Sequence, residues 1–210
     1  MTVVRCSATQ LALEKIEHPL HYAPNPELVP HESIQWQVFR RTEICDLRTP
    51  SGYERTQVVR LIEDYREKYG SVLMICNTKS EAREVYLELA GRDCTGLFHL
   101  STAMCMEHRL DVLRQIQESL KEEGHTVCVS TQLVEAGVDF SFGCVIRILA
   151  GLDNVVQAAG RGNRHGKKES LCPVYIINWD APTATEFLEI LSHYIRRSLS
   201  ANRVAQSLKM

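Results

Sequence analysis

The sequence lacks paired cysteines, long apolar stretches and a strong excess of either charge. Its 210 residues include eight cysteines, but no two of them form a C-x-x-C pair, so a zinc ribbon or a thioredoxin-type site finds no support. No run of about 20 apolar residues that could span a membrane is found. A formal net charge of −2 excludes a histone-like partner of nucleic acid, although it allows a local basic site.

Export, phosphate-loop and metal signals are missing as well. The first residues carry no basic-then-apolar segment, which predicts a cytoplasmic protein with free thiols. The sequence contains neither a G-x-x-x-x-G-K-[ST] loop nor an Asp-Glu-x-His/Asp box. Cys105 and His108 have a ligand-like separation, but no second pair matches them, so we expect no metal site.

What the sequence does contain is an alternation of strands and helices from residue 70 onward. Apolar residues make up 44% and charged residues 24%, as in ordinary globular proteins. Amphipathic helices are predicted from Ala82 to Leu89 and from Leu110 to Leu120, and a short helix at 154–160. Short connections between such elements predict an α/β fold with a parallel sheet flanked by helices. The predicted strands are 71–76, 96–101, 126–130, 144–149 and 174–178.

The two ends of the chain follow a different pattern. Four prolines mark 18–30 as a linker. The alternating segment 34–38 predicts an edge strand that pairs with 43–48, and 58–69 has the spacing of a helix. A strand end at 3–6 opens the chain, from which we expect that a segment upstream has been removed. Thr183 and Glu186 form a candidate capping box for a closing helix.

The segment 157–166 carries the sharpest chemical signal. Arg161 and Arg164 are three residues apart and would share one face of a helix. Two neighbouring guanidinium groups suit the oxygens of a polyphosphate, because each presents planar, fixed donors. Gly160 removes a side chain where a close approach of the backbone would help. The alternative is a solvated basic helix end that continues into Lys167 and Lys168.

Three further segments follow predicted strands. In 130–139, Thr131 offers a hydroxyl and an amide to a phosphate, and Asp139 offers a carboxylate to a ribose hydroxyl or a metal-bound water. The alternative there is a turn that caps a helix. In 100–109, the side chains of Ser101, Thr102 and Arg109 suit a sugar-phosphate backbone, with a solvated first helical turn as the alternative. The polar residues at 7–9 are by themselves common in loops.

Taken together, these segments resemble the motifs of superfamily 2 helicases. Ser-Ala-Thr at 7–9, Asn-Thr after a strand at 77–78, Ser-Thr-Gln-x-x-Glu-Ala-Gly-Val-Asp at 130–139 and Gln-x-x-Gly-Arg-x-x-Arg at 157–164 stand in the order of motifs III to VI. General members often read Gln-Arg-x-Gly-Arg-x-Gly-Arg, whereas this chain has Ala158 and Asn163. This form of the motif resembles that of the CRISPR-associated helicase-nuclease of type I interference, and the resemblance covers residues 2 to about 180.

The resemblance implies a motor driven by ATP with Mg²⁺ that moves 3′-to-5′ on single-stranded DNA and carries an HD-type nuclease domain. ATP would lie between two RecA-like lobes. The implied roles are arginine fingers at Arg161 and Arg164, nucleotide binding at Gln157, Gly137 and Asp139, coupling of hydrolysis to lobe movement at Ser7 and Thr9, and a DNA track at Ser101, Thr102, Arg109 and Thr131.

The implied organisation is that of a piece of a longer protein. Residues 1–16 would be a remnant of the first lobe, 17–56 a linker with edge strands, 57–182 the second RecA-like lobe and 183–210 a C-terminal helix. No His-Asp dipeptide occurs, so the nuclease metal site is expected elsewhere, with the first lobe. The implied partners are single-stranded DNA and a CRISPR RNA-guided surveillance complex. Two alternatives stay open, namely a lobe of another DNA-repair or RNA helicase and a non-catalytic α/β binding module.

Overall fold

A computed structural model of the protein describes residues 40–179, apart from 93, 123–124, 136–138 and 167–168. The folded unit considered below begins at Arg41. Ser7, Thr9 and Gly137 lie outside the described residues, and so do the elements expected at 3–6, 34–38 and 183–210.

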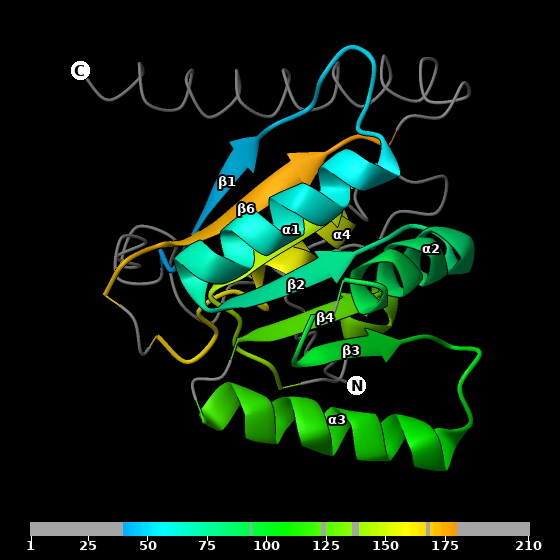
Figure 1. The fold of residues 1–210 in the computed structure, drawn as a ribbon. Coiled ribbons are helices and arrows are strands. Elements are labelled where there is room, and N and C mark those ends of the chain that lie inside the picture. The colour runs from blue at the N-terminus through cyan, green and yellow to red at the C-terminus, as the bar shows by residue number, and fades with distance from the viewer. Residues whose placement is uncertain (1–39, 93, 123–124, 136–138, 167–168, 180–210) are drawn as a thin grey trace, which may run out of the picture. The chain divides into compact units, whose positions relative to one another are not determined.

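The described residues form a sheet of six parallel strands in the order β1-β6-β5-β2-β4-β3 (Figure 1). All five predicted strands are present, with ends shifted by no more than two residues. The sixth strand, β1, was predicted at 43–48, and it pairs in parallel with β6. The strands are β1 (Thr42–Asp46), β2 (Ser71–Ile75), β3 (Leu97–Leu100), β4 (Thr126–Ser130), β5 (Cys144–Ile148) and β6 (Cys172–Ile177).

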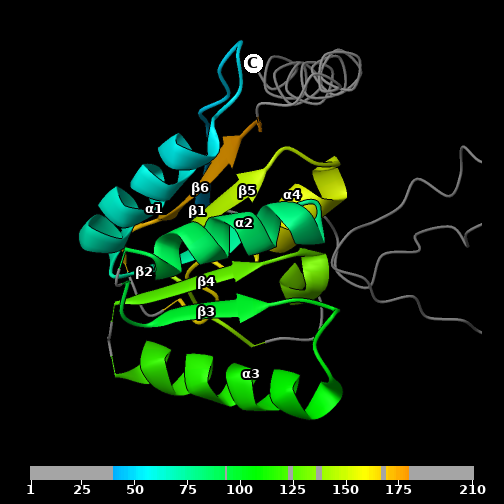
Figure 2. The same ribbon diagram turned by 45° about the vertical axis from the view of Figure 1, so that its right-hand side comes forward.

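Helices cover both faces of this sheet (Figure 2). On one face, α1 (Arg55–Tyr69) and α2 (Lys79–Ala90) pack their apolar stripes onto the strands. On the other face lie α3 (Met106–Lys121) and α4 (Leu152–Ala159). The sheet is therefore buried between two apolar layers, which explains why every residue of β4 and β5 is buried instead of every second one. The predicted parallel α/β fold is confirmed.

Local sequence sets where α2 begins. Thr78 caps α2, because its hydroxyl accepts a hydrogen bond from the backbone N–H of Glu81 at 3.2 Å. In return, the Glu81 carboxylate accepts a hydrogen bond from the backbone N–H of Thr78 at 3.0 Å. In α3 the apolar face differs slightly from the prediction. Val112 and Ile116 are buried, whereas the side of the helix that carries Leu110 is turned outward and leaves that residue 47% exposed.

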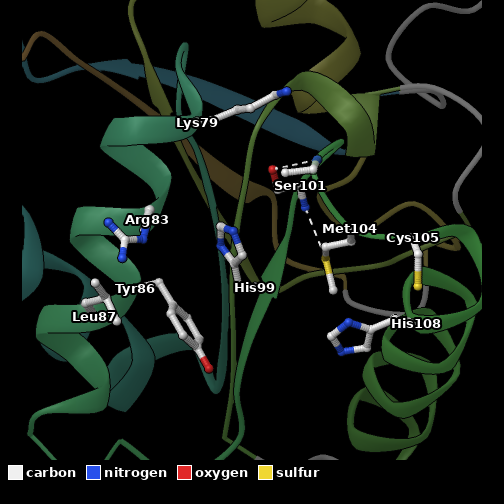
Figure 3. Close-up of a pocket in the computed structure, with 10 residues that line it drawn as sticks. Lys79, Arg83, Tyr86, Leu87, His99, Ser101, Met104, Cys105 and His108 are labelled. Carbon is white, nitrogen blue, oxygen red and sulfur yellow. Dashed lines mark hydrogen bonds between the residues drawn. The ribbon is translucent and has the colours of Figure 1, made fainter.

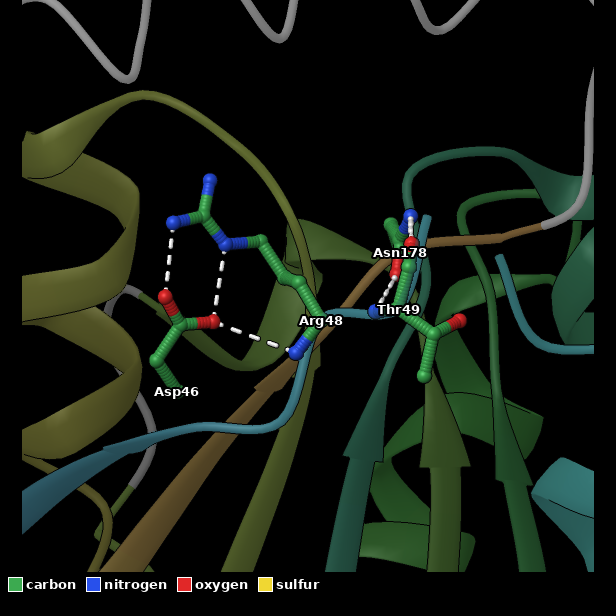
Figure 4. A network of polar contacts seen from close by, with 4 residues as sticks. All are labelled: Asp46, Arg48, Thr49 and Asn178. Carbon is green, nitrogen blue, oxygen red and sulfur yellow. Dashed lines mark hydrogen bonds and ion pairs between the residues drawn. The ribbon is translucent and has the colours of Figure 1, made fainter. Parts of the chain in front are cut away.

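A buried amide fastens the segment after β1 to the end of β6 (Figure 4). The side chain of Asn178 accepts a hydrogen bond from the backbone N–H of Thr49 at 3.0 Å and donates one to the Thr49 carbonyl at 2.7 Å. Nearby, the Asp46 carboxylate pairs with the guanidinium of Arg48 at 2.6 Å on the surface. No helix in the described part of the chain is long and apolar enough to cross a membrane.

Removing this amide should cost far more than removing the surface ion pair beside it. We expect Asn178→Ala to lower the free energy of unfolding by about 1–3 kcal/mol, because it leaves the partly buried Thr49 amide without its acceptor and removes one of the two hydrogen bonds to the Thr49 carbonyl. Asp46→Asn should cost less than about 1 kcal/mol, because water replaces an exposed partner. Urea unfolding of the chain measures both changes, and equal losses would contradict this description.

Candidate functional site

The register of the sheet aligns the ends of four strands in one row. Ser130 on β4 pairs with Ile75 on β2 and with Leu100 on β3, and Ile75 pairs in turn with Arg147 on β5. Because the strands are parallel, the residues that follow each of them meet at one edge of the sheet. This edge brings together the predicted DNA-track residues Ser101 and Thr131.

The two hydroxyl residues at this edge are largely buried. Ser101 is 3% and Thr131 is 8% exposed. The Thr131 amide donates a hydrogen bond to the carbonyl of Leu100 at 3.4 Å, so its hydroxyl rather than its amide is left for a ligand. The Ser101 hydroxyl accepts a hydrogen bond from the amide of Ala103 at 3.2 Å, whereas the neighbouring Thr102 is exposed.

Arg109 supports the loop that carries these residues. Its Nη2 donates a hydrogen bond to the carbonyl of Met104 at 3.1 Å, and its side chain is half-buried. The same loop is closed by a hydrogen bond from the amide of Met104 to the carbonyl of Ser101 at 3.1 Å. In this structure Arg109 therefore holds the loop in shape.

A buried arginine in β5 was not singled out from the sequence. Arg147 donates through Nη1 to the side-chain oxygen of Asn77 at 2.6 Å and to the carbonyl of Ile148 at 2.7 Å. Asn77 in turn donates to the carbonyl of Leu149 at 2.8 Å. These bonds join the loops that follow β2 and β5. An arginine within an otherwise apolar strand was the sequence signal for this link.

The two predicted finger arginines do not share a helical face, so that expectation is wrong. Helix α4 ends at Ala159, and Asn163 has a φ of 41°, which no α-helix contains. The loop is held instead by Phe142, whose amide donates to the carbonyl of Arg161 at 2.9 Å and whose carbonyl accepts from the amide of Asn163 at 3.0 Å. Gly162 forms an isolated parallel bridge with the same phenylalanine.

The structure places Arg164 beside Asp139. In the sequence the two belong to different motifs, where Arg164 is predicted as an arginine finger and Asp139 as a nucleotide-binding residue. The Nε of Arg164 lies 2.8 Å from a carboxylate oxygen of Asp139, and Nε2 of His165 lies 3.6 Å from the same oxygen. The side chains of Arg164 and Asp139 are 41% and 62% exposed. Arg161 is only 7% exposed, and Gln157 is half-buried on α4.

The thiols are of two kinds. Burial raises the pKa of Cys76, Cys128 and Cys144, which keeps them as neutral apolar groups. Cys105 differs from the expected buried thiol, because it is exposed at the residue before α3. Within the described ranges, no group of three or more His, Cys, Asp and Glu side chains is placed to hold a metal ion.

The glycine that this loop requires is Gly162 rather than Gly160. A Cβ atom on Gly162 would lie 2.5 Å from the sulfur of Cys172, so the loop packs directly onto the start of β6. A Cβ atom on Gly160 would lie no closer than 3.3 Å to the backbone oxygen of Gln157.

Alanine substitutions should separate these two glycines. Gly162→Ala should destabilise the chain by about 1–3 kcal/mol in urea unfolding, because the new methyl group overlaps Cys172. Combining it with Cys172→Ala should recover part of that loss. Gly160→Ala is the matched control and should change the free energy of unfolding by less than about 1 kcal/mol. Equal losses for the two single variants would contradict the assignment.

Comparison with known protein sequences finds a similar family over the residues that carry these loops. Residues 68–167 match the model described as the C-terminal region of the CRISPR-associated nuclease/helicase Cas3. The Cas3 of Methanothermobacter thermautotrophicus is 25% identical over 146 residues, which are 69% of this chain and 16% of that protein. The ATP-dependent helicase Lhr-Core of Methanocaldococcus jannaschii is 30% identical over 122 residues, which are 57% of this chain and 14% of that protein. The chain thus spans less than a fifth of the length of either relative.

Solved structures share the fold. The crystal structure of T. fusca Cas3 with AMPPNP superimposes with a TM-score of 0.58 and 21% identity, covering 69% of this chain and 19% of that chain. A chain of a CRISPR RNA-guided surveillance complex in a pre-nicking state superimposes with a TM-score of 0.55 and 20% identity, covering 69% of this chain and 20% of that chain. Residues 68–167 are therefore similar to the C-terminal region of the Cas3 nuclease/helicases.

Proposed function

We propose that this chain supplies the second RecA-like motor lobe of an ATP-dependent DNA helicase-nuclease that acts in CRISPR antiviral interference. The observation that carries the proposal is the pair formed by Arg164 and Asp139, which lies within the residues that match the Cas3 family. It presents a guanidinium and a carboxylate on one exposed surface, where a nucleotide held by another lobe could reach them.

The geometry of this pair suggests how Arg164 acts as an arginine finger. Asp139 is 2.8 Å from the Nε of Arg164, an arrangement that leaves the two Nη groups to donate to phosphate oxygens. Asp139 would then orient the finger instead of blocking it. Arg161 is buried beneath the surface, so we propose that it contacts the nucleotide only after the lobes close. Gln157 and Gly137 would complete this side of the nucleotide site.

The edge formed by the strand ends would carry the DNA. Thr102 is exposed, and the hydroxyls of Ser101 and Thr131 lie at the ends of neighbouring strands. Hydroxyl groups at such positions contact the sugar-phosphate backbone without reading the base sequence. Arg109 would act mainly by holding the loop of Ser101, as its hydrogen bond to Met104 indicates.

The remaining parts of the machine would come from outside the described residues. The Mg²⁺ ion bound with ATP would be held by a first lobe. Ser7 and Thr9 would couple hydrolysis to lobe movement, and a CRISPR RNA-guided surveillance complex would deliver the DNA. The similarity to Lhr-Core favours a second candidate, the lobe of another superfamily 2 helicase. An HD-type nuclease domain on the same polypeptide would favour the first candidate, the CRISPR-associated helicase-nuclease.

Removing either guanidinium should abolish the motor activity. In a protein that joins this chain to its first lobe, we expect Arg164→Ala and Arg161→Ala to lower DNA-stimulated kcat for ATP hydrolysis by about 10³–10⁵-fold, the usual effect of losing an arginine finger. Arg114→Ala, at an exposed arginine of α3, is the control and should leave kcat unchanged. Unchanged turnover in Arg164→Ala would reject the finger assignment, and robust turnover by the chain alone would reject the need for a first lobe.

DNA binding by the chain alone should be weak and sensitive to salt. Half of the proposed track belongs to another lobe, and the contacts are mainly to phosphates. The logarithm of the binding constant should fall with the logarithm of salt concentration by about 0.7 for each phosphate contacted on a single strand. Fluorescence anisotropy with labelled single-stranded DNA measures this slope. Tight binding that persists at high salt would contradict the proposed track.

A further inference from the structure

A cavity of about 510 Å³ lies beside the edge strand β3, between α2 and the start of α3 (Figure 3). It falls within the size range of small-molecule sites. Neither the predicted DNA track nor the predicted nucleotide site includes its walls, with the exception of Ser101.

One wall of the cavity is a basic face of α2. Lys79 and Arg83 are four residues apart and therefore lie on the same side of the helix, with Tyr86 one turn beyond Arg83. The side chains of both cations are exposed. The residues that line the cavity include no carboxylate, so the field inside it favours an anion.

A second wall is flat and aromatic. The ring of Tyr86 lies 5.2 Å from the ring of His99 on β3, with an angle of 43° between their planes. Burial lowers the pKa of His99, so its imidazole is uncharged at pH 7. The thioether of Met104, held by the Ser101 amide at 3.4 Å, contributes an apolar surface nearby. An anion that also has a flat, weakly polar face fits these two walls together.

The cavity is continuous with the edge where the DNA track is proposed. Ser101 lines the cavity and also stands in the row of strand ends next to Thr131. Figure 3 shows Lys79 at the end of the cavity nearest Ser101 and Tyr86 farther along α2. Single-stranded DNA that passes Ser101 could therefore place one of its nucleotides in the cavity.

We propose that this cavity binds one nucleotide of single-stranded DNA, with the base against Tyr86 and the phosphate beside Lys79 and Arg83. The inference rests on the proposed function, because it needs DNA at the edge of the sheet. It adds a contact to a base, which the hydroxyls of the track do not make. Stacking on an aromatic ring is tolerant of sequence, since every base has a flat face.

The test compares two fluorescein-labelled oligomers of equal length, an oligothymidylate and a fully abasic strand, binding to the full chain at low salt. We expect the wild-type chain to bind the oligothymidylate more tightly. Tyr86→Leu, which keeps an apolar side chain, should weaken that binding by about fivefold to a hundredfold and leave the abasic strand unaffected. Arg83→Ala should weaken the binding of both oligomers and reduce the dependence of binding on salt. Arg60→Ala, at an exposed arginine of α1, is the control and should leave both the affinity and the salt dependence unchanged.

The outcomes separate the two proposals. If Tyr86→Leu binds oligothymidylate as tightly as the wild type and Thr102→Ala loses binding, the proposal that the cavity binds a base is wrong. The proposed DNA track would then stand. Equal affinity of the wild-type chain for the two oligomers would also overturn it. Absence of binding to either oligomer by a chain that unfolds cooperatively in urea would overturn both proposals. Thermal unfolding of each variant shows whether it retains the fold.

Discussion

The parallel pairing of β2 with β4 and β5 is the constraint on which the rest of the structure depends. Ile75, Ser130 and Arg147 lie side by side in this pairing, so the chain leaves three central strands at the same edge. The hydrogen bonds alone do not select this register. It is set by burial on both faces, because the apolar layers beneath α1 and α3 fit only when the strands are aligned. The ends of β3 and β4 are followed within two residues by three members of the proposed DNA track, Ser101, Thr102 and Thr131.

A second constraint acts at Phe142. Its two backbone hydrogen bonds to Arg161 and Asn163, together with the contact of Gly162 with Cys172, fix a loop that would otherwise be a free connection between α4 and β6. The consequence is chemical, since this fixed loop brings Arg164 to Asp139. The proposed nucleotide-binding surface thus depends on backbone geometry in a loop whose described residues form no regular helix or strand.

The sequence predicted the elements of the sheet well because their signals are local. The apolar run of β4 and the helical spacing of Ala82 and Val85 are each contained in a few residues. The pairing of Asp139 with Arg164 joins positions that only the tertiary fold brings together. The loop that carries Arg161 and Arg164 was missed, because it is held by backbone hydrogen bonds to Phe142, which is distant in the sequence. Motif resemblance named both residues of the pair but said nothing of their contact.

We expect a nucleotide to contact this chain on the surface formed by Arg164 and Asp139. The most direct measurement is a structure of the two-lobed protein with a non-hydrolysable ATP analogue and single-stranded DNA. We expect an Nη group of Arg164 within hydrogen-bonding distance of the terminal phosphate, with Asp139 still bound to Nε. A nucleotide held far from Arg164 in a closed, DNA-bound state would contradict the account.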